Sequence, residues 1–353
     1  MANASDYYIG ANDEHGLNPP TAGKRTPVMP YINRSFYENE FNRKAKYYFI
    51  LACLRCGFRV YDVKPEIGDV SISTRVARVN ARGLTLLVTF AYNAFGDGIG
   101  FNNVNGYLVF YGADGYRPTM SRLLSFDLSA GLSETITTKN LGVGTLSGVG
   151  VLRSVRCTSA LVEAGFMTNF EEAKLMVDPD FQRAVGEGAC IGVCNYLGVP
   201  YVSDDVIYPT LRRGSRGNYV IILQYMLRNA GYDVDTDGIF GSATETAVRS
   251  FQAENGLAAD GIVGKNTWAV LRWKFNPLPV LRRGSRGEAV KYLQSKLLSK
   301  LYPVGEIDGI FGAATERAVR EFQEENGLAV DGIVGKNTWA KLTPIGGGRP
   351  LPQ

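Results

Sequence analysis

The chain has 353 residues, of which 45% are hydrophobic, and this length predicts about two to three domains with packed cores. The 38 Lys and Arg residues outnumber the 34 Asp and Glu residues by only four, which is too small an excess to indicate a nucleic-acid-binding surface. There is no apolar stretch of about 18 residues and no basic run followed by an apolar core at the amino terminus. We therefore expect neither a membrane span nor a signal peptide, and synthesis in the cytoplasm.

Short apolar strands alternate with amphipathic helices in the first 200 residues. Strands are predicted at 7–11, 58–63, 84–90, 107–111 and 159–162, and helices at 35–56, 73–80, 120–132 and 170–197. Nearly continuous apolar strands that alternate with helices are typical of a sheet covered on both faces. The predicted class is therefore α/β, with a mixed, mostly parallel sheet flanked by helices.

Three residues follow predicted strands and are expected at one edge of that sheet, because sites in such sheets gather at the carboxyl ends of strands. They are His15, which is the only histidine, Ala91 and Glu163, which is followed by the expected strand breaker Gly165. A carboxylate at the end of an apolar strand either reaches water or serves a charged partner such as a metal. A single histidine in a turn is most often a polar loop residue, although neutral imidazole is also the commonest metal ligand.

Glu38 lies in the first turn of the helix that Ser35 is expected to open. The segment Ser35-Phe36-Tyr37-Glu38 fits the S-x-x-E capping box, in which the glutamate accepts a hydrogen bond from the cap N–H. A capping role and a role in a site are both open for this carboxylate.

Five cysteines, an odd number, argue against a disulfide framework and favour a reducing site of synthesis. Cys53 and Cys56 form a CxxC pair, and Cys190 and Cys194 form a CxxxC pair, so a zinc cluster has to be considered. Both pairs fall within apolar helical patterns, which favours buried thiols in the core.

The chain repeats itself after a Pro- and Asp-containing linker at 200–210. The matched segments begin at Leu211 and Leu281, Asp237 and Asp308, Glu254 and Glu325, and Asp260 and Asp331. Each copy carries three short helical patterns, so two all-α three-helix modules are predicted at 211–273 and 281–343, with a flexible tail at 344–353. A capping box is predicted at Ser242–Glu245 in the first copy, and Ala313 removes it from the second.

Both copies resemble the peptidoglycan-binding three-helix module of bacterial and phage wall hydrolases. The resemblance rests on LQ at Leu223 and Leu293, on AVRSFQ and AVREFQ, and on DGIFG and DGIVGKNTW in each copy. It implies peptidoglycan as the partner, and two linked modules would raise the residence time on the wall through effective concentration. A purely structural repeat is the alternative.

Residues 1–199 resemble the catalytic domain of zinc-dependent N-acetylmuramoyl-L-alanine amidases. The motifs are NDEHGLNPPTAGKRTP from Asn12, YENEFNRK from Tyr37, TFAYNAFGDG from Thr89 and LVEAGFMTN from Leu161. The resemblance implies that His15 and Glu38 are zinc ligands and that Glu163 is the general acid or base.

The position of the family's third zinc ligand, a histidine, falls on Ala91, which offers no lone pair. No second histidine is available, and Tyr92 is expected to point to the opposite face of the strand. Glu14 also replaces the small Gly that usually precedes the first histidine. We interpret Ala91, whether natural or engineered, as a replacement that inactivates an otherwise active enzyme.

The resemblance implies hydrolysis of the amide between N-acetylmuramic acid and the L-alanine of the stem peptide. In that family zinc polarises the carbonyl and lowers the pKa of its bound water to about 7, and Glu163 would move the proton. The alternatives are a catalytically dead wall-binding or regulatory protein, and a wall-anchoring part of a phage or injection particle. An endolysin-like enzyme without a signal peptide is expected to meet the wall after lysis, through a holin or in a mother cell.

Overall fold

The computed structural model describes residues 3–16, 24–272 and 279–343. The chain divides into two compact units, one ending at Asp204 and the other beginning at Asp205. The predicted tail at 344–353 and residues 17–23 of the first amidase-like motif lie outside the described residues. The finer domain boundaries stay predictions.

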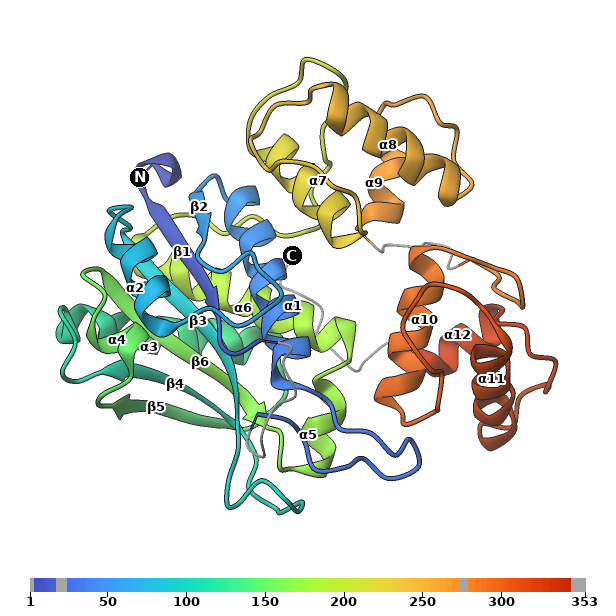
Figure 1. Cartoon of the computed structure of the whole chain (residues 1–353), viewed down its shortest axis with the longest axis horizontal. Helices are drawn as coiled ribbons and strands as arrows, with labels where there is room; N and C mark the ends of the chain where they lie inside the picture. Colours follow the sequence, from blue (N-terminus) through green and yellow to red (C-terminus); the bar gives the residue numbers. More distant parts are fainter. Residues whose placement is uncertain (1–2, 17–23, 273–278, 344–353) are drawn as a thin grey trace. The chain divides into compact units, whose positions relative to one another are not determined.

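A six-stranded sheet in the order β2-β1-β3-β6-β4-β5 forms the centre of the first unit (Figure 1). Its strands are β1 (Tyr8–Asp13), β2 (Arg59–Asp62), β3 (Leu86–Asn93), β4 (Tyr107–Gly112), β5 (Asn140–Leu146) and β6 (Thr158–Phe166). Neighbouring strands are parallel except β4 and β6, which are antiparallel. The predicted mixed, mostly parallel sheet is confirmed.

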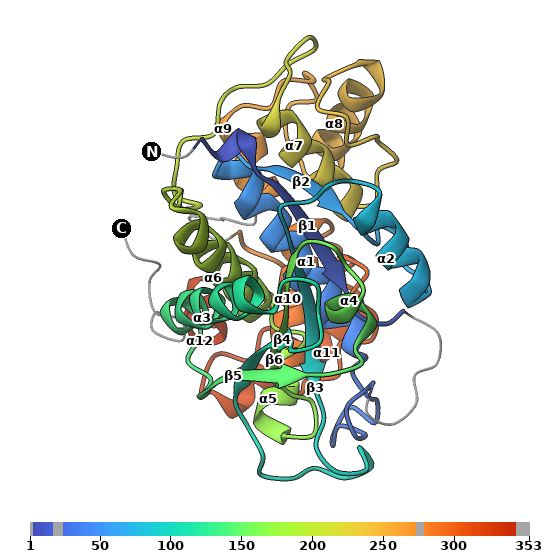
Figure 2. The same cartoon turned by 90° about the vertical axis from the view of Figure 1, so that its left-hand side faces the viewer.

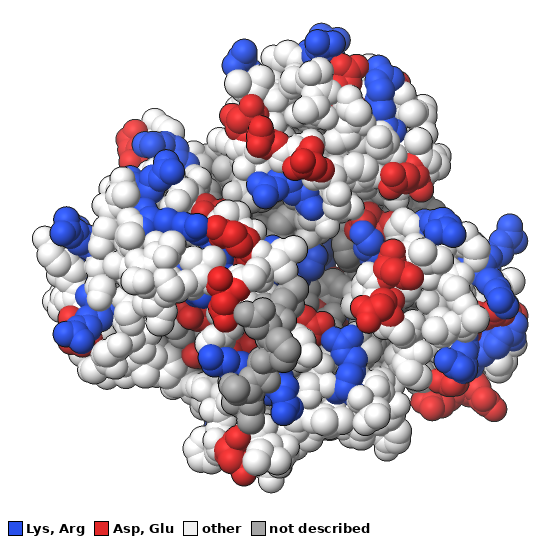
Figure 3. All heavy atoms as spheres, viewed as in Figure 1, with Lys and Arg blue, Asp and Glu red and all other residues white. Residues whose placement is uncertain are grey.

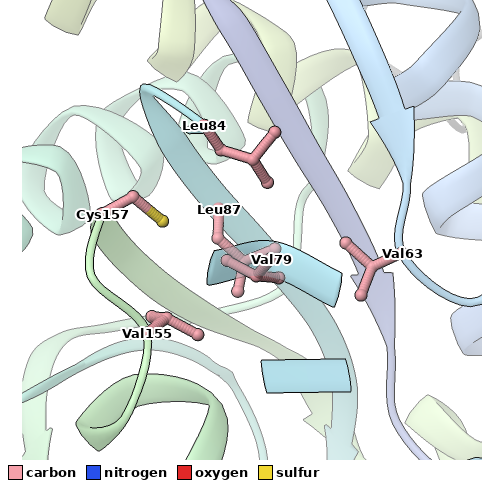
Figure 4. Packing of buried hydrophobic residues seen from close by; sticks show 6 residues of the cluster. All are labelled: Val63, Val79, Leu84, Leu87, Val155 and Cys157. Atoms are coloured by element: carbon pink, nitrogen blue, oxygen red, sulfur yellow. The ribbon is translucent and has the colours of Figure 1, made fainter. Parts of the chain in front are cut away.

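Helices cover both faces of this sheet (Figure 2). One face carries α1 (Glu38–Arg55), α3 (Pro118–Thr135) and α6 (Pro179–Leu197), the other carries α2 (Ile72–Asn80) and α4 (Gly150–Arg153), and η1 (Ala4–Asp6) and α5 (Phe170–Leu175) lie beside strand ends. On the α2 face, buried aliphatic side chains and one thiol form a cluster between α2 and β3 (Figure 4). Its members are Val63, Val79, Leu84, Leu87, Val155 and Cys157.

Strand β6 continues through Gly165, so the expectation that this glycine ends the strand is wrong. A Cβ atom at this position would lie 2.6 Å from the hydroxyl oxygen of Tyr92. Tyr92 comes from the neighbouring strand β3, and its ring packs edge-on against Phe41 of α1. Gly165 therefore makes room for the tyrosine that fixes α1 against the sheet.

Among its described residues, the second unit contains two sets of three helices, which confirms the predicted all-α modules. They are α7 (Asn218–Asn229), α8 (Ser242–Glu254) and α9 (Lys265–Leu271), followed by α10 (Glu288–Ser299), α11 (Ala313–Glu325) and α12 (Lys336–Leu342). The predicted capping box is wrong, because Gly241 precedes α8 and no side chain caps that helix. Glu245 instead pairs with Arg249 at 3.0 Å, so the second module loses no cap through Ala313.

A buried glutamine organises the first helix pair of each module. In the first module, Gln224 accepts a hydrogen bond from the N–H of Gly238 at 2.9 Å and donates to Asp237 at 2.8 Å and to Thr244 at 3.2 Å. Gln294 makes the corresponding bonds in the second module. One side chain thus holds the DGIFG loop against two helices.

We expect the substitution Gln224→Leu to destabilise the first module by about 2–4 kcal/mol, because a side chain of similar size would leave several buried polar groups unpaired. Urea unfolding of the full chain, with limited proteolysis as the readout for the first module, measures the change in its stability. Tyr219→Phe on the same helix is the control. If Gln224→Leu unfolds at the same urea concentration as the parent, the glutamine network does not stabilise the module.

Acidic and basic side chains are interspersed on the molecular face in Figure 3, as expected for a net charge of +4. Among the described residues, no helix has the length and apolar character that a membrane span requires. Surface charge therefore does not bear on the expectation of a wall enzyme that binds no nucleic acid. That expectation depends on the residues of the site.

Candidate functional site

The carboxyl ends of β1, β3 and β6 meet at one edge of the sheet, because these three strands are adjacent and parallel. The register pairs Ala91 of β3 with Glu163 of β6, so both side chains lie on the same face of the sheet. His15 follows β1, and Glu38 is the first residue of α1. The sheet and one helix terminus thus gather the four predicted site residues in one region.

Two asparagines in the first turns of α1 anchor the loop that carries His15. Asn39 donates to the backbone carbonyl of His15 at 2.8 Å, and Asn42 donates to that of Glu14 at 3.2 Å. His15 itself has a φ angle of +61°, a left-handed conformation that non-glycine residues seldom adopt. The asparagine contacts hold this conformation and turn the imidazole toward α1.

Glu38 faces His15 and does not cap its helix, so the capping-box interpretation is wrong. The N–H of Tyr37 donates instead to the carboxylate of Glu40 at 2.6 Å. Glu38 Oε1 accepts hydrogen bonds from Asn42 at 2.9 Å and from the N–H of Tyr92 at 3.0 Å. Its other oxygen, Oε2, lies 3.4 Å from His15 Nε2.

The carboxylate of Glu163 is poorly solvated and has an unpaired oxygen. Its Oε2 atom is buried and accepts no hydrogen bond from the described residues. Burial raises the pKa of Glu163 well above its ordinary value, and the nearby carboxylates of Glu38 and Glu14 raise it further. A buried carboxyl oxygen without a hydrogen-bond partner indicates a place where a proton or a cation would be stabilised.

Burial also shifts the two residues that face each other beside Glu163. It raises the pKa of Glu38 to about 8, while the hydrogen bonds from Asn42 and Tyr92 oppose the shift. Burial and the charge of Lys24 lower the pKa of His15 to about 4. His15 is therefore neutral at pH 7, the form in which an imidazole nitrogen can bind a metal.

Ala91 is 4% exposed and packs against Val151, Leu152 and Leu161. It brings no donor atom to the region of Glu163. Tyr92 does not replace it, because its hydroxyl donates to the backbone carbonyl of Glu172 at 2.8 Å and its ring lies against α1.

The donors present meet only part of the requirement for a catalytic zinc. Two atoms that share a tetrahedral zinc at about 2.1 Å lie about 3.4 Å apart, and His15 Nε2 and Glu38 Oε2 have this spacing. A catalytic zinc site needs a third protein ligand, and the residue that the family resemblance assigns to that position is Ala91. The residues as they stand therefore do not fit a catalytic zinc.

The sequence does not predict a role in the site for the charged residues that lie behind it. Arg75 of α2 pairs with Glu14 at 3.3 Å and donates to the backbone carbonyl of Asp13 at 2.9 Å. Asp13 in turn pairs with Lys46 at 2.5 Å and with Lys64 at 3.0 Å. These buried pairs fix the end of β1. The only sign of them in the sequence is that polar residues directly follow the apolar residues of the strand.

Comparison with known proteins agrees with this arrangement. The profile described as "N-acetylmuramoyl-L-alanine amidase" matches residues 18–195, half of the chain. The profile described as "Putative peptidoglycan binding domain" matches residues 216–271 and 286–342.

Individual relatives include N-acetylmuramoyl-L-alanine amidase CwlM of Mycobacterium tuberculosis, which is 35% identical over 32% of this chain and 30% of the relative. A probable N-acetylmuramoyl-L-alanine amidase of Bacillus licheniformis is 34% identical over 38% of this chain and 45% of the relative. The chain thus spans less than half the length of these curated relatives.

Among solved structures, an N-acetylmuramoyl-L-alanine amidase from Clostridium difficile 630 is 22% identical, with a TM-score of 0.45, over 56% of this chain and 98% of that structure. From the family match over half of its length, this chain belongs to the N-acetylmuramoyl-L-alanine amidase family.

Proposed function

We propose that the first unit is a peptidoglycan amidase scaffold, built for the amide between N-acetylmuramic acid and the L-alanine of the stem peptide. The second unit would hold it on the bacterial cell wall through its two modules. One observation carries this proposal: the neutral imidazole of His15 and the carboxyl group of Glu38 lie 3.4 Å apart, at the sheet edge where one carboxyl oxygen of Glu163 has no hydrogen-bond partner among the described residues. Family membership and the two module matches support it.

The same geometry supports an inactive state for the chain as it stands. Zinc would supply Lewis-acid chemistry in an intact site, but two donors and an alanine are a poor site for it. We therefore assign no catalytic step to this chain. His15 and Glu38 remain preorganised as ligands, and Glu163 remains as a proton carrier without an activated water.

Two modules in one chain favour retention on the wall even if each binds weakly. Once one module is bound, the second meets its ligand at a high effective concentration, which raises the overall avidity. A chain that binds and does not cut would act as a wall-binding or regulatory protein. That is the second candidate function, and Ala91 is the observation that favours it.

Sedimentation with purified sacculi and analysis of the soluble products test both parts of the proposal. We expect the chain to pellet with sacculi and to release no new L-alanine amino termini above a protein-free blank. New amino termini released by the unaltered chain would contradict the inactive state. New reducing sugar ends would contradict the choice of the amide bond. Failure to pellet would contradict wall binding by the modules.

A further inference from the structure

Four of the five cysteines gather at one buried place in the first unit, between α1 and α6. Cys53 and Cys56 come from the end of α1, and Cys190 and Cys194 come from α6. Residues three or four positions apart share one face of a helix, so each pair presents both thiols on the same side. Because α1 and α6 pack together, the two faces meet.

Three of the four sulfur atoms have the spacing of ligands to a single metal ion, and the fourth, Cys53 Sγ, lies close to one of them. Cys190 Sγ lies 3.7 Å from Cys53 Sγ and 3.8 Å from Cys56 Sγ. The sulfurs of Cys56, Cys190 and Cys194 all lie within 4.8 Å of one another. In a tetrahedral zinc site with Zn–S bonds of about 2.3 Å, neighbouring sulfurs lie about 3.8 Å apart. A disulfide would need a separation of about 2.05 Å, and a cluster of several iron atoms spreads its thiolates farther apart.

A polar contact to one sulfur also favours a thiolate over an inert core thiol. The backbone N–H of Val202 donates to Cys56 Sγ at 3.3 Å. The guanidinium of Arg55, the residue before Cys56, donates to the backbone carbonyl of Val202 at 2.8 Å and pairs with the buried carboxylate of Glu187 at 2.5 Å, which fixes the Val202 segment against this end of α1. Hydrogen bonds to the ligand atoms orient and stabilise them in metal sites.

We propose that Cys56, Cys190 and Cys194 bind one thiophilic divalent ion, with Zn²⁺ as the expected metal, and that Cys53 turns its side chain to supply the fourth thiolate. The four thiols release their protons to solvent. The site is structural, because four thiolates leave no open position for a substrate. It is separate from the amidase site, since Cys53 follows Glu38 by 15 residues along α1, which corresponds to about 22 Å. The ion would fasten α1 to α6 and to the segment at Val202.

Native mass spectrometry and elemental analysis of the full chain, purified under reducing conditions without chelator, test this proposal. We expect one zinc per chain. After exchange with Co²⁺ we expect a thiolate-to-cobalt charge-transfer band, which His15 and Glu38 cannot produce because they carry no sulfur. Removal of the metal is expected to lower the melting temperature by several degrees, because binding free energy of a structural metal adds to folding.

The double variant Cys56→Ser/Cys190→Ser is expected to lose the zinc and the charge-transfer band. Cys157→Ser, at the fifth buried cysteine in the α2 cluster (Figure 4), is the matched control and should keep both. If the double variant does not fold, protection of four thiols from alkylation by zinc in the parent gives the same information.

Absence of bound metal in the reduced parent, a mass that includes an iron–sulfur cluster, or a charge-transfer band that survives in the double variant would each overturn the proposal. A Glu38→Gln chain that keeps its zinc would show that the ion does not reside at the amidase site.

Discussion

Ala91→His is expected to raise the release of stem peptides from sacculi by more than about 100-fold. Loss of a contact that merely supports a metal ligand costs 10–100-fold in affinity or activity, and restoring a ligand itself should have a larger effect. The imidazole would project on the face that Glu163 occupies, since residues 91 and 163 are register partners. Liquid chromatography of the released peptides measures the rate, and elemental analysis measures the zinc gained relative to the parent.

Ala91→Leu is the matched control, because it adds similar bulk without a lone pair and should gain neither zinc nor activity. The combined Ala91→His/Glu163→Gln chain should gain zinc and remain inactive, which would assign the proton transfer to Glu163. If Ala91→His binds additional zinc and still releases no stem peptide, the amidase hypothesis is wrong. If it binds no additional zinc, residue 91 is not the third ligand position.

The sequence predicted the α/β class because its signal is local: apolar runs of strand length alternate with amphipathic helices. It does not predict β5, whose segment NLGVGTL contains two glycines and lies at the edge of the sheet. Glycine weakens a strand pattern, and an edge strand is half solvated, so neither apolar continuity nor clean alternation is present.

Sequence patterns indicate the candidate site only in part, for the same reason. His15 and Glu163 stand out as polar residues after apolar strands, but Glu38 matched a capping box until the structure gave that role to Glu40. The anchoring role of Asn39 could not be read from the sequence, since an amide near a helix start has no periodic signature. Family resemblance, and not spacing, singled out Ala91.

The cysteines show a further limit of sequence patterns. The spacing of Cys190 and Cys194 predicts that the two thiols share a helix face, and the expectation that they are buried is confirmed. Spacing contains no information on which face of another helix lies opposite. Only the packing of α6 on α1 brings them to Cys53 and Cys56, which weakens the case for independent core thiols.

Glu163→Gln is expected to make the metal-free chain progressively more stable than the parent as the pH rises. The pKa of Glu163 is raised well above its ordinary value of 4.5 by burial, so the folded chain keeps a proton that the unfolded chain releases above that pH. Each rise in pH between these two pKa values then favours the unfolded parent. Glutamine is neutral throughout and does not contribute to this loss.

Between pH 5 and pH 8 we expect the difference in unfolding free energy between Glu163→Gln and the parent to grow by about 1–3 kcal/mol. One pKa unit corresponds to about 1.4 kcal/mol, and local relaxation relieves part of the pKa shift. Urea unfolding at both pH values, with a chelator present, measures it. The control is Glu171→Gln, because the Glu171 side chain is 74% exposed and its replacement should give the same difference at both pH values. A pH-independent difference for Glu163→Gln would mean that this carboxylate ionises as easily in the folded chain as in the unfolded one. In that case, relief of a buried, unpaired charge on Glu163 could not be the source of the affinity of an intact site for a cation.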